Sequence, residues 1–115
     1  MKKKLLLIIV AVLLPIVSIS AFDVCIGGIC YDLYGGQAKV THGDVDGYYT
    51  GNIVIPSYIV YLDATYPVMS IEDEAFFGCK DLKSVTLPNS NSFIAIGHYA
   101  FSHCTSLTSI TCWLN

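Results

Sequence analysis

The C-terminal half of the chain contains a repeat with an offset of 25 residues. Residues 71–88 align with residues 96–113, and the two segments agree mainly at apolar and small positions; Ala75-Phe76, for example, recurs as Ala100-Phe101. A repeat of this length is typical of proteins built from stacked units, in which each unit buries its apolar face only against its neighbours. The repeat therefore predicts an array of stacked units, mainly β in content.

Each unit is expected to combine a strand with a turn. Residues 83–87 alternate polar and apolar side chains and include β-branched residues, which favours a short strand, and Pro88 ends it because proline has no amide donor. Ala75-Phe76 and Cys79 are expected on the opposite, convex side, in a short helical or irregular turn. The predicted repeat core consists of Ile71, Ala75, Phe76, Cys79, Leu82, Val85, Leu87, Ile96, Ala100, Phe101, Cys104, Leu107 and Ile110.

The segment before the repeats, residues 22–67, is predicted to form a β cap. Apolar runs at residues 22–26 and 29–34 flank Gly27-Gly28, which is typical of a β-hairpin with a two-residue turn. In that register Cys25 and Cys30 face each other as a non-hydrogen-bonded pair, close enough for a disulfide. We therefore predict a Cys25–Cys30 disulfide.

The rest of the cap is expected to contain a second hairpin. Residues 38–41 and 48–55 would be its arms, joined by residues 42–47. The run 53–56 resembles 85–88, so it is also a candidate for the first strand of the repeat sheet. Residues 58–66 are interpreted as an exposed crossing segment that turns at residues 63–65.

Residues 1–21 have the three-part layout of a secretory signal peptide. Lysines at positions 2–4 precede an apolar run at residues 5–17, and small residues at 18–21 have the spacing of a cleavage site. The alternative is an uncleaved anchor, but the apolar run is short for a membrane span of about 20 residues. The protein is therefore expected to be secreted or displayed at the cell surface, with membrane contact only through this segment before its cleavage.

The charge of residues 22–115 excludes some classes of partner. This part of the chain has three lysines, no arginine and nine acidic residues, a net charge of −6. Nucleic-acid binding depends on lysine and arginine side chains that neutralise phosphates. We therefore expect neither nucleic acid nor an anionic membrane surface as a partner.

Candidate catalytic and metal-binding residues are few. Cys79, His98, His103 and Cys104 could supply zinc ligands, but their spacing matches no regular zinc pattern, and the alternative is core cysteines and surface histidines. The acidic run 72–74 is interpreted as a solvated face, because nothing indicates a cleft that would hold two carboxylates at a catalytic separation. We therefore expect no metal, no cofactor and no enzymatic activity.

Five of the eight tyrosines lie close together in residues 48–66. Tyrosine is enriched at protein interfaces because it combines an apolar ring with a polar tip. The alternative is that several of these rings pack within the cap itself. The predicted interaction surface consists of Tyr48, Tyr49, Tyr58, Tyr61 and Tyr66.

The repeat resembles the BspA-type leucine-rich repeat. The positions that carry the resemblance are Ile71, Ala75-Phe76, Cys79, Leu82 and 85–90 in one unit, and Ile96-Gly97, Ala100-Phe101, Cys104 and 107–111 in the next. Residues 27–32, 38–41 and 51–56 are similar to the cap that precedes such arrays. The resemblance implies a right-handed solenoid with a strand sheet on one face, formed by the cap at 22–67 and two repeats at 68–115.

The resemblance also implies a function. Members of this family are often exported or surface-attached bacterial proteins that bind proteins of a host or of a neighbouring cell. We therefore expect an extracytoplasmic protein–protein interaction module without catalytic residues. The alternative is a truncated or self-associating fragment of a longer repeat protein, which would pair with another copy through an open C-terminal edge around Ile110, Cys112, Trp113 and Leu114.

Overall fold

The structure, a computed structural model, describes residues 22–88 and 95–112. Within these ranges the chain forms nine strands and no helix, so the prediction of a mainly β protein is confirmed, and the turns are irregular. The predicted signal peptide lies outside the described residues. The strands are β1 (Val24–Ile26), β2 (Ile29–Tyr34), β3 (Gln37–Val40), β4 (Gly51–Val54), β5 (Tyr58–Tyr61), β6 (Ala64–Ile71), β7 (Leu82–Leu87), β8 (Ala95–Ile96) and β9 (Ser109–Cys112).

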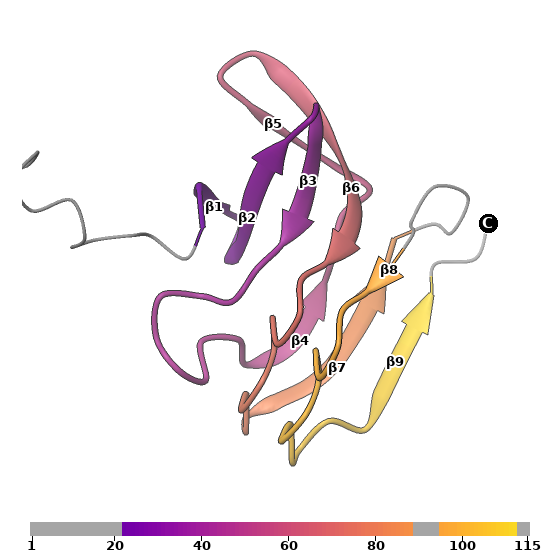
Figure 1. Cartoon of the computed structure of the whole chain (residues 1–115). Helices are drawn as coiled ribbons and strands as arrows, with labels where there is room; N and C mark the ends of the chain where they lie inside the picture. The colour runs from indigo at the N-terminus through magenta and orange to yellow at the C-terminus, as the bar shows by residue number, and fades with distance from the viewer. Residues whose placement is uncertain (1–21, 89–94, 113–115) are drawn as a thin grey trace, which may run out of the picture.

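The strands form two sheets, between which the chain passes back and forth (Figure 1). One sheet has the order β1-β2-β3-β6-β5, with β8 also pairing with β6, and the other has the order β4-β7-β9. Strands β3, β6 and β8 pair in parallel in the first sheet, as do β4, β7 and β9 in the second. Each passage from the first sheet to the second adds one strand to both, which winds the chain into stacked coils.

The strand register reproduces the 25-residue offset of the sequence. Ile71 pairs with Ile96 in one sheet, and Val85 pairs with Ile110 in the other. In the same way, Val40 pairs with Ile71 and Ile53 pairs with Val85, so the cap strands β3 and β4 extend the same two sheets. The resemblance between residues 53–56 and 85–88 therefore marks β4 as part of the repeat sheet, as predicted.

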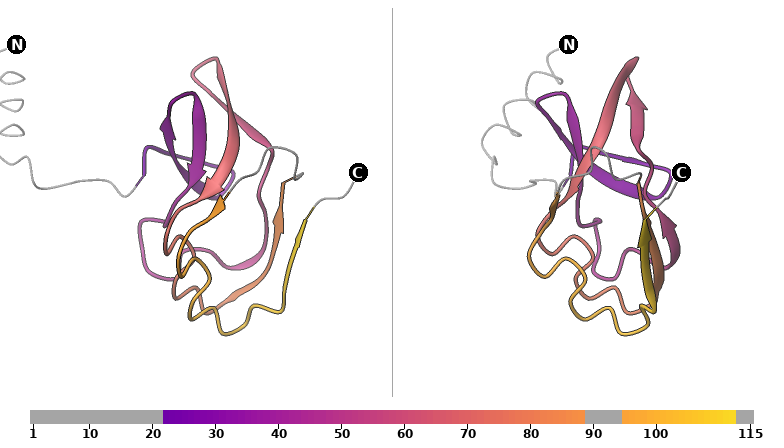
Figure 2. Two further views of the ribbon diagram at one scale, coloured as in Figure 1. Left: turned by 45° about the vertical axis from the view of Figure 1, so that its right-hand side comes forward. Right: turned by 90° about the vertical axis from the view of Figure 1, so that its right-hand side faces the viewer.

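The turns at one end of the molecule stack in the same way as the strands (Figure 2). The amides of Glu74, Phe76 and Gly78 donate to the carbonyls of His98, Ala100 and Ser102 at 2.8–2.9 Å. These bonds satisfy backbone groups that an irregular turn would otherwise leave unpaired. Neighbouring coils are therefore joined through strands and turns alike.

Two expectations for the cap are wrong. Residues 38–41 and 48–55 do not form a hairpin, because β3 pairs with β2 and β6 while β4 pairs with β7 in the other sheet. Residues 58–66 are not a crossing segment that turns at 63–65 but the antiparallel pair of β5 with the first half of β6, turning at Leu62-Asp63. This β5–β6 hairpin projects beyond the stacked coils in Figure 1.

The core lies between the two sheets and the stacked turns. The first-unit positions Ile71, Ala75, Phe76, Cys79, Leu82, Val85 and Leu87 are all buried there. Phe76 connects three coils, since its ring centroid lies 4.5 Å from that of Tyr49 and 4.9 Å from that of Phe101. Successive coils thus interlock through aromatic side chains.

The second unit is less buried than the sequence predicts. Ala100 is buried, but Phe101, Cys104 and Leu107 are only partly buried. Ile96 and Ile110 are 46% and 43% exposed, so placing them in the core was wrong. The cause is position: each equivalent residue in the first unit is covered by the second unit, whereas the second unit lies at the edge of the described stack.

Candidate interaction surface

Cys25 and Cys30 form a disulfide at the edge of the first sheet. The β1–β2 register places them opposite each other, next to the turn at Gly27-Gly28. Both glycines have positive φ, 62° and 83°, which a two-residue turn of this kind requires. The bond ties the short edge strand β1 to β2.

Tyr49 lies in the core and is not part of a surface, which corrects its place among the predicted interaction residues. It is 1% exposed. Its hydroxyl accepts a hydrogen bond from the Cys30 amide at 3.0 Å and donates to the Thr41 carbonyl at 2.6 Å. Burial raises the pKa of Tyr49, so the hydroxyl stays protonated and links β2 to the segment after β3.

Tyr31 is equally buried, but its hydroxyl finds no hydrogen-bond partner among the described residues.

Replacing Tyr49 with phenylalanine should lower the free energy of unfolding by about 1–3 kcal/mol, because an amide and a carbonyl lose their partner. Replacing Tyr31 with phenylalanine should leave it unchanged or raise it, because no bond is lost. Denaturant unfolding of both variants measures the difference, and equal losses would contradict it.

Tyr48 also packs inward, in part. Its ring crosses Gly43 so closely that any side chain at position 43 would collide with it, and it meets the Tyr49 ring edge-on at 5.0 Å. Tyr61 and Tyr66 are half-buried on the inner face of the β5–β6 hairpin. Of the five predicted tyrosines, only Tyr58 is largely exposed, at 58%.

Tyr58 borders an apolar groove of about 460 Å³. The groove lies between the β1–β2 hairpin, which contributes Ile26, Ile29 and Tyr31, and the end of β4 and strand β5, which contribute Val54, Tyr58 and Val60. All of its lining side chains are apolar or aromatic. Val54 and Val60 are more than half exposed, so this groove gathers surface apolar residues that water would ordinarily disfavour.

Val54 was not predicted as a surface residue, and Val60 and Leu62, which lie in the segment expected to be exposed, were not predicted as part of an interaction surface. The signal was present in the alternation of 58–61, where Tyr58 and Val60 share one strand face and Ile59, which is buried, lies on the other. Periodicity cannot say which of two apolar faces is covered. In β5, the strand face that carries Ile59 packs against the core.

Leu62 is the most exposed large apolar residue described, at 79%, and its backbone is strained. Its φ is 51° and that of the following Asp63 is 65°, in the left-handed region that leucine rarely adopts. Leu62→Gly should raise the free energy of unfolding by about 1 kcal/mol, because glycine has no Cβ to clash in this region. Thermal unfolding would show this, and a lower midpoint would contradict it.

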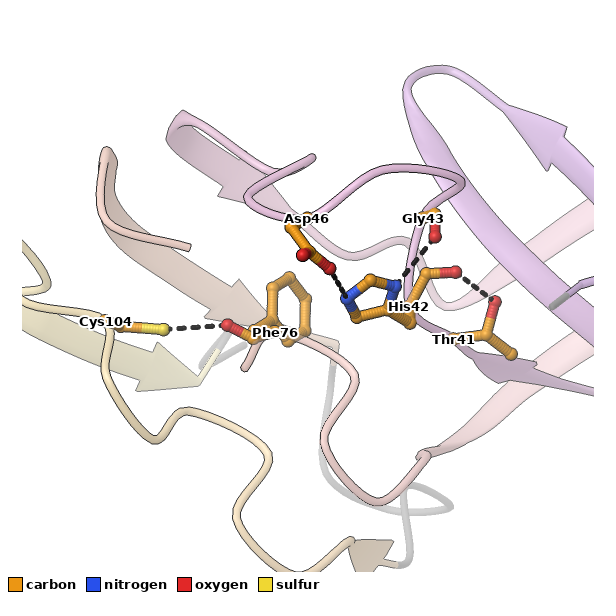
Figure 3. A network of polar contacts seen from close by, with 6 residues as sticks. All are labelled: Thr41, His42, Gly43, Asp46, Phe76 and Cys104. Atoms are coloured by element: carbon orange, nitrogen blue, oxygen red, sulfur yellow. Dashed lines mark hydrogen bonds and ion pairs between the residues drawn. The ribbon is translucent and has the colours of Figure 1, made fainter. Parts of the chain in front are cut away.

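Two of the four candidate zinc ligands, Cys104 and His103, make other side-chain contacts. Cys104 donates its thiol to the Phe76 carbonyl at 3.0 Å (Figure 3), and burial raises its pKa. The His103 ring packs on Phe77 at 4.8 Å, and His98 donates its amide to the Asp73 carboxylate at 2.7 Å. Within residues 22–88 and 95–112, no three metal-ligating side chains lie close enough together to hold an ion.

A second histidine contact lies in the loop between β3 and β4. His42 Nδ1 lies 2.7 Å from the Gly43 carbonyl, and its Nε2 lies 3.9 Å from the Asp46 carboxylate (Figure 3). Asp46 is fully exposed, so solvent screens this pair strongly. The contact orients the loop and gives no sign of an activated base.

A polar pocket of about 510 Å³ lies on the outer face of the first sheet. Lys39 places its ammonium 5.1 Å from the centre of the Tyr34 ring there. Burial raises the pKa of Asp32, and the Asp23 carboxylate adds to this. Burial likewise raises the pKa of Glu72, and Asp32 adds to that shift. Lys39 lowers both pKa values, but burial and the neighbouring carboxylates outweigh its effect.

The raised pKa values of Asp32 and Glu72 predict that mild acid stabilises the protein. Since the folded state raises the pKa of Asp32 and Glu72, it binds their protons more tightly than the unfolded chain does. Their contribution is complete below the unfolded pKa values, about 4, and is lost as pH rises through the raised folded values. The unfolding midpoint should rise as the pH is lowered from 7 to about 4. The Asp32→Asn, Glu72→Gln double variant should flatten this dependence, and an unchanged slope would contradict the assignment.

The described part of the chain contains no helix that is long and apolar enough to cross a membrane.

Comparison with known proteins identifies the repeat. Residues 54–114, just over half of the chain, match the family model described as "BspA type Leucine rich repeat region (6 copies)". The chain belongs to the BspA-type leucine-rich repeat family. The resemblance noted in the sequence is thereby confirmed, and the stacked register of β6–β9 lies within the matched residues.

Solved leucine-rich repeat proteins share the fold. One from Bacteroides capillosus is 28% identical with a TM-score of 0.65, and one from Bacteroides ovatus is 28% identical with a TM-score of 0.68. A leucine-rich repeat protein of T. pallidum is 29% identical with a TM-score of 0.60. Each match covers 77% of this chain, which spans 64%, 23% and 38% of the respective proteins. The curated proteins include no match.

Proposed function

We propose that this BspA-type leucine-rich repeat chain is an extracytoplasmic protein–protein interaction module that carries out no catalysis. The observation that carries the proposal is the apolar groove between the β1–β2 hairpin and β5, bordered by the exposed side chains of Val54, Tyr58 and Val60. Exposed apolar patches around a groove mark interaction sites. Leucine-rich repeat proteins generally act through protein binding, which agrees with this surface.

The proposal includes export and the organisation of the repeats. Residues 1–21 act as a signal peptide, residues 22–67 as a cap, and residues 68–115 as two repeats of a right-handed solenoid. The partner is a protein of a host or of a neighbouring cell. Intact-mass measurement of the protein recovered from the producing cells tests export, since cleavage at the predicted site leaves a chain that begins at Ala21 or Phe22.

Site-specific photocrosslinking tests the binding function. The full chain is produced in its own cells with p-benzoylphenylalanine in place of Val60, and separately in place of Val45. The two residues are equally exposed, at 57% and 58%, but Val45 lies in the β3–β4 loop outside the groove. A discrete protein adduct at position 60 and none at position 45 supports the proposal. Adducts at both positions, or at neither, would refute it.

The self-associating alternative rests on the half-exposed Ile96 and Ile110 at the edge of the stack. Another copy that covered this edge would bury both. Sedimentation over a range of concentrations separates the two readings. A monomer agrees with binding through the groove, whereas self-association that Ile110→Lys abolishes and Val45→Lys does not would favour the alternative.

A further inference from the structure

The backbone of β5 offers a hydrogen-bonding edge beside the apolar groove. Among the described strands, β5 pairs on one side only, with β6. The Val68 amide donates to the Ser57 carbonyl at 2.8 Å. Because the backbone groups of successive residues in a strand point alternately to its two sides, those of Ser57, Ile59 and Tyr61 face β6. The amide and carbonyl groups of Tyr58 and Val60 therefore face outward.

The opposite wall of the groove is the other edge of the same sheet. Strands β1 and β5 are the two outer strands of the order β1-β2-β3-β6-β5, and the groove is lined by residues of both β1 and β5. The sheet therefore curls until its two edges face each other across an apolar seam. Edge strands left open in this way are the usual sites of strand addition.

Tyr31 lies beside this seam and carries a buried polar group. It lines the groove from β2, it is fully buried, and its hydroxyl lacks a hydrogen-bond partner among the described residues. A buried hydroxyl without a partner is costly and calls for an explanation such as a missing ligand group. A peptide carbonyl or amide that reached the hydroxyl from the seam would satisfy it.

We propose that the seam binds an extended peptide segment of a partner protein, which adds to β5 as a strand. This inference rests on the proposed protein-binding function and specifies its ligand. The segment pairs with the outward backbone groups of Tyr58 and Val60 and places alternate apolar side chains in the groove. Basic residues flank these apolar side chains, because the domain has a net charge of −6 and the exposed Asp23 and Asp63 lie three residues from the lining residues Ile26 and Val60.

The test uses a synthetic peptide with the chemistry stated above. The probe is fluorescein-labelled Lys-Thr-Val-Thr-Val-Thr-Lys, and its affinity for the chain produced without residues 1–21 in oxidising conditions is measured by fluorescence anisotropy. Replacing both valines with serine should weaken binding by about tenfold or more, since the groove loses its apolar contacts. Replacing both lysines with glutamate should also weaken it, and added salt should reduce that difference.

Backbone methylation distinguishes strand addition from general hydrophobic contact. In a strand, the amides of the valines point to one edge and those of the threonines to the other. Methylating the two valine nitrogens, or instead the nitrogens of the three threonines, should therefore give one peptide that loses binding and one that retains it. Equal effects of both methylations would overturn the proposal, as would the absence of binding by the unmodified probe.

Protein variants locate the site. Val60→Pro removes an outward amide from an edge strand, where proline is tolerated, and should reduce the affinity about tenfold or more. Tyr31→Phe should weaken binding while the unfolding midpoint is kept, because its hydroxyl has no partner within the fold. Val45→Thr is the control and should change neither. If Val60→Pro unfolds, Val60→Lys at the same exposed position replaces it, and unchanged affinity in a folded variant would overturn the proposal.

The outcomes separate this inference from the proposed function. Strand addition is rejected if a partner crosslinks at position 60 but the probe peptide does not bind, or if both methylations affect binding equally. The proposed interaction module would still stand in that case. No adduct at position 60 rejects the proposed function.

Discussion

Phe76→Ala should lower the free energy of unfolding by about 3–5 kcal/mol, a large part of the 5–15 kcal/mol that stabilises a typical domain. Phe76 is fully buried and lies between the rings of Tyr49 and Phe101. Its removal leaves a cavity at the point where three coils meet. Denaturant unfolding of the chain in oxidising conditions measures the loss.

Phe101→Ala is the matched control, because Phe101 occupies the same position one unit later. It is only partly buried and has an aromatic neighbour at Phe76 alone among the described stacking contacts. Its loss should be about 1–2 kcal/mol, since its side chain is already partly exposed to solvent. Equal losses for the two variants would mean that the stacked coils do not cover the first unit in the way described.

Gly97→Ala should cost about 3 kcal/mol, at the upper end of the range for overpacking. A Cβ at position 97 would lie 2.6 Å from the Glu72 carbonyl carbon and would also collide with the Asp73 amide nitrogen. These are backbone atoms of the neighbouring coil, and a rotamer change cannot move them. The Gly97 amide also donates to the Ile71 carbonyl at 2.8 Å, so any shift that relieves the clash lengthens that bond.

Gly35→Ala provides the comparison for Gly97→Ala. Gly35 has a φ of 57°, but a Cβ there would meet no atom within 4 Å. Its cost should be about 1 kcal/mol, from backbone conformation alone. If Gly97→Ala cost no more than Gly35→Ala, the close approach of the two coils would be contradicted.

The repeat fold was predictable because its information is local or periodic. The offset between Ile71 and Ile96 is visible in the sequence and becomes the strand register. The pairing of Cys25 with Cys30 follows from the two-residue turn between them. The two cysteines are only five residues apart in the sequence, so no distant contact is needed to bring them together. Where a short segment determines the geometry, composition and spacing suffice.

The errors arise where distant segments decide the structure. Residues 38–41 and 48–55 alternate as hairpin arms would, but parallel pairing with β6 and β7 sends them into different sheets. Residue type alone predicts Tyr49 as a surface aromatic, but its hydroxyl accepts a hydrogen bond from the amide of Cys30, 19 residues away in the sequence. The turn at Leu62 could not be predicted, because the residue preferences of turns place glycine or asparagine, not leucine, at a positive φ.

The same reasoning explains why the candidate surface was only partly predicted. Tyr58 was identified from its residue type, whereas Val54 and Val60 become visible only when β4 and β5 meet the β1–β2 hairpin. The exposure of Ile96 depends on what lies beside its coil, which the repeat pattern does not encode, whereas the exposure of Ile110 agrees with the open edge expected in the self-associating alternative.

Hydroxyl-radical footprinting of the protein in its producing cells, compared with the purified chain, tests the central claim most directly. If the groove binds another protein, oxidation of its exposed lining residues Val54, Tyr58 and Val60 should be reduced in the cells. Oxidation of Val45 and Tyr99, which are equally or more exposed than Tyr58 but do not line the groove, should be the same in both samples. Undiminished oxidation of Tyr58 and Val60, or protection confined to Val45 and Tyr99, would contradict the groove as the binding surface.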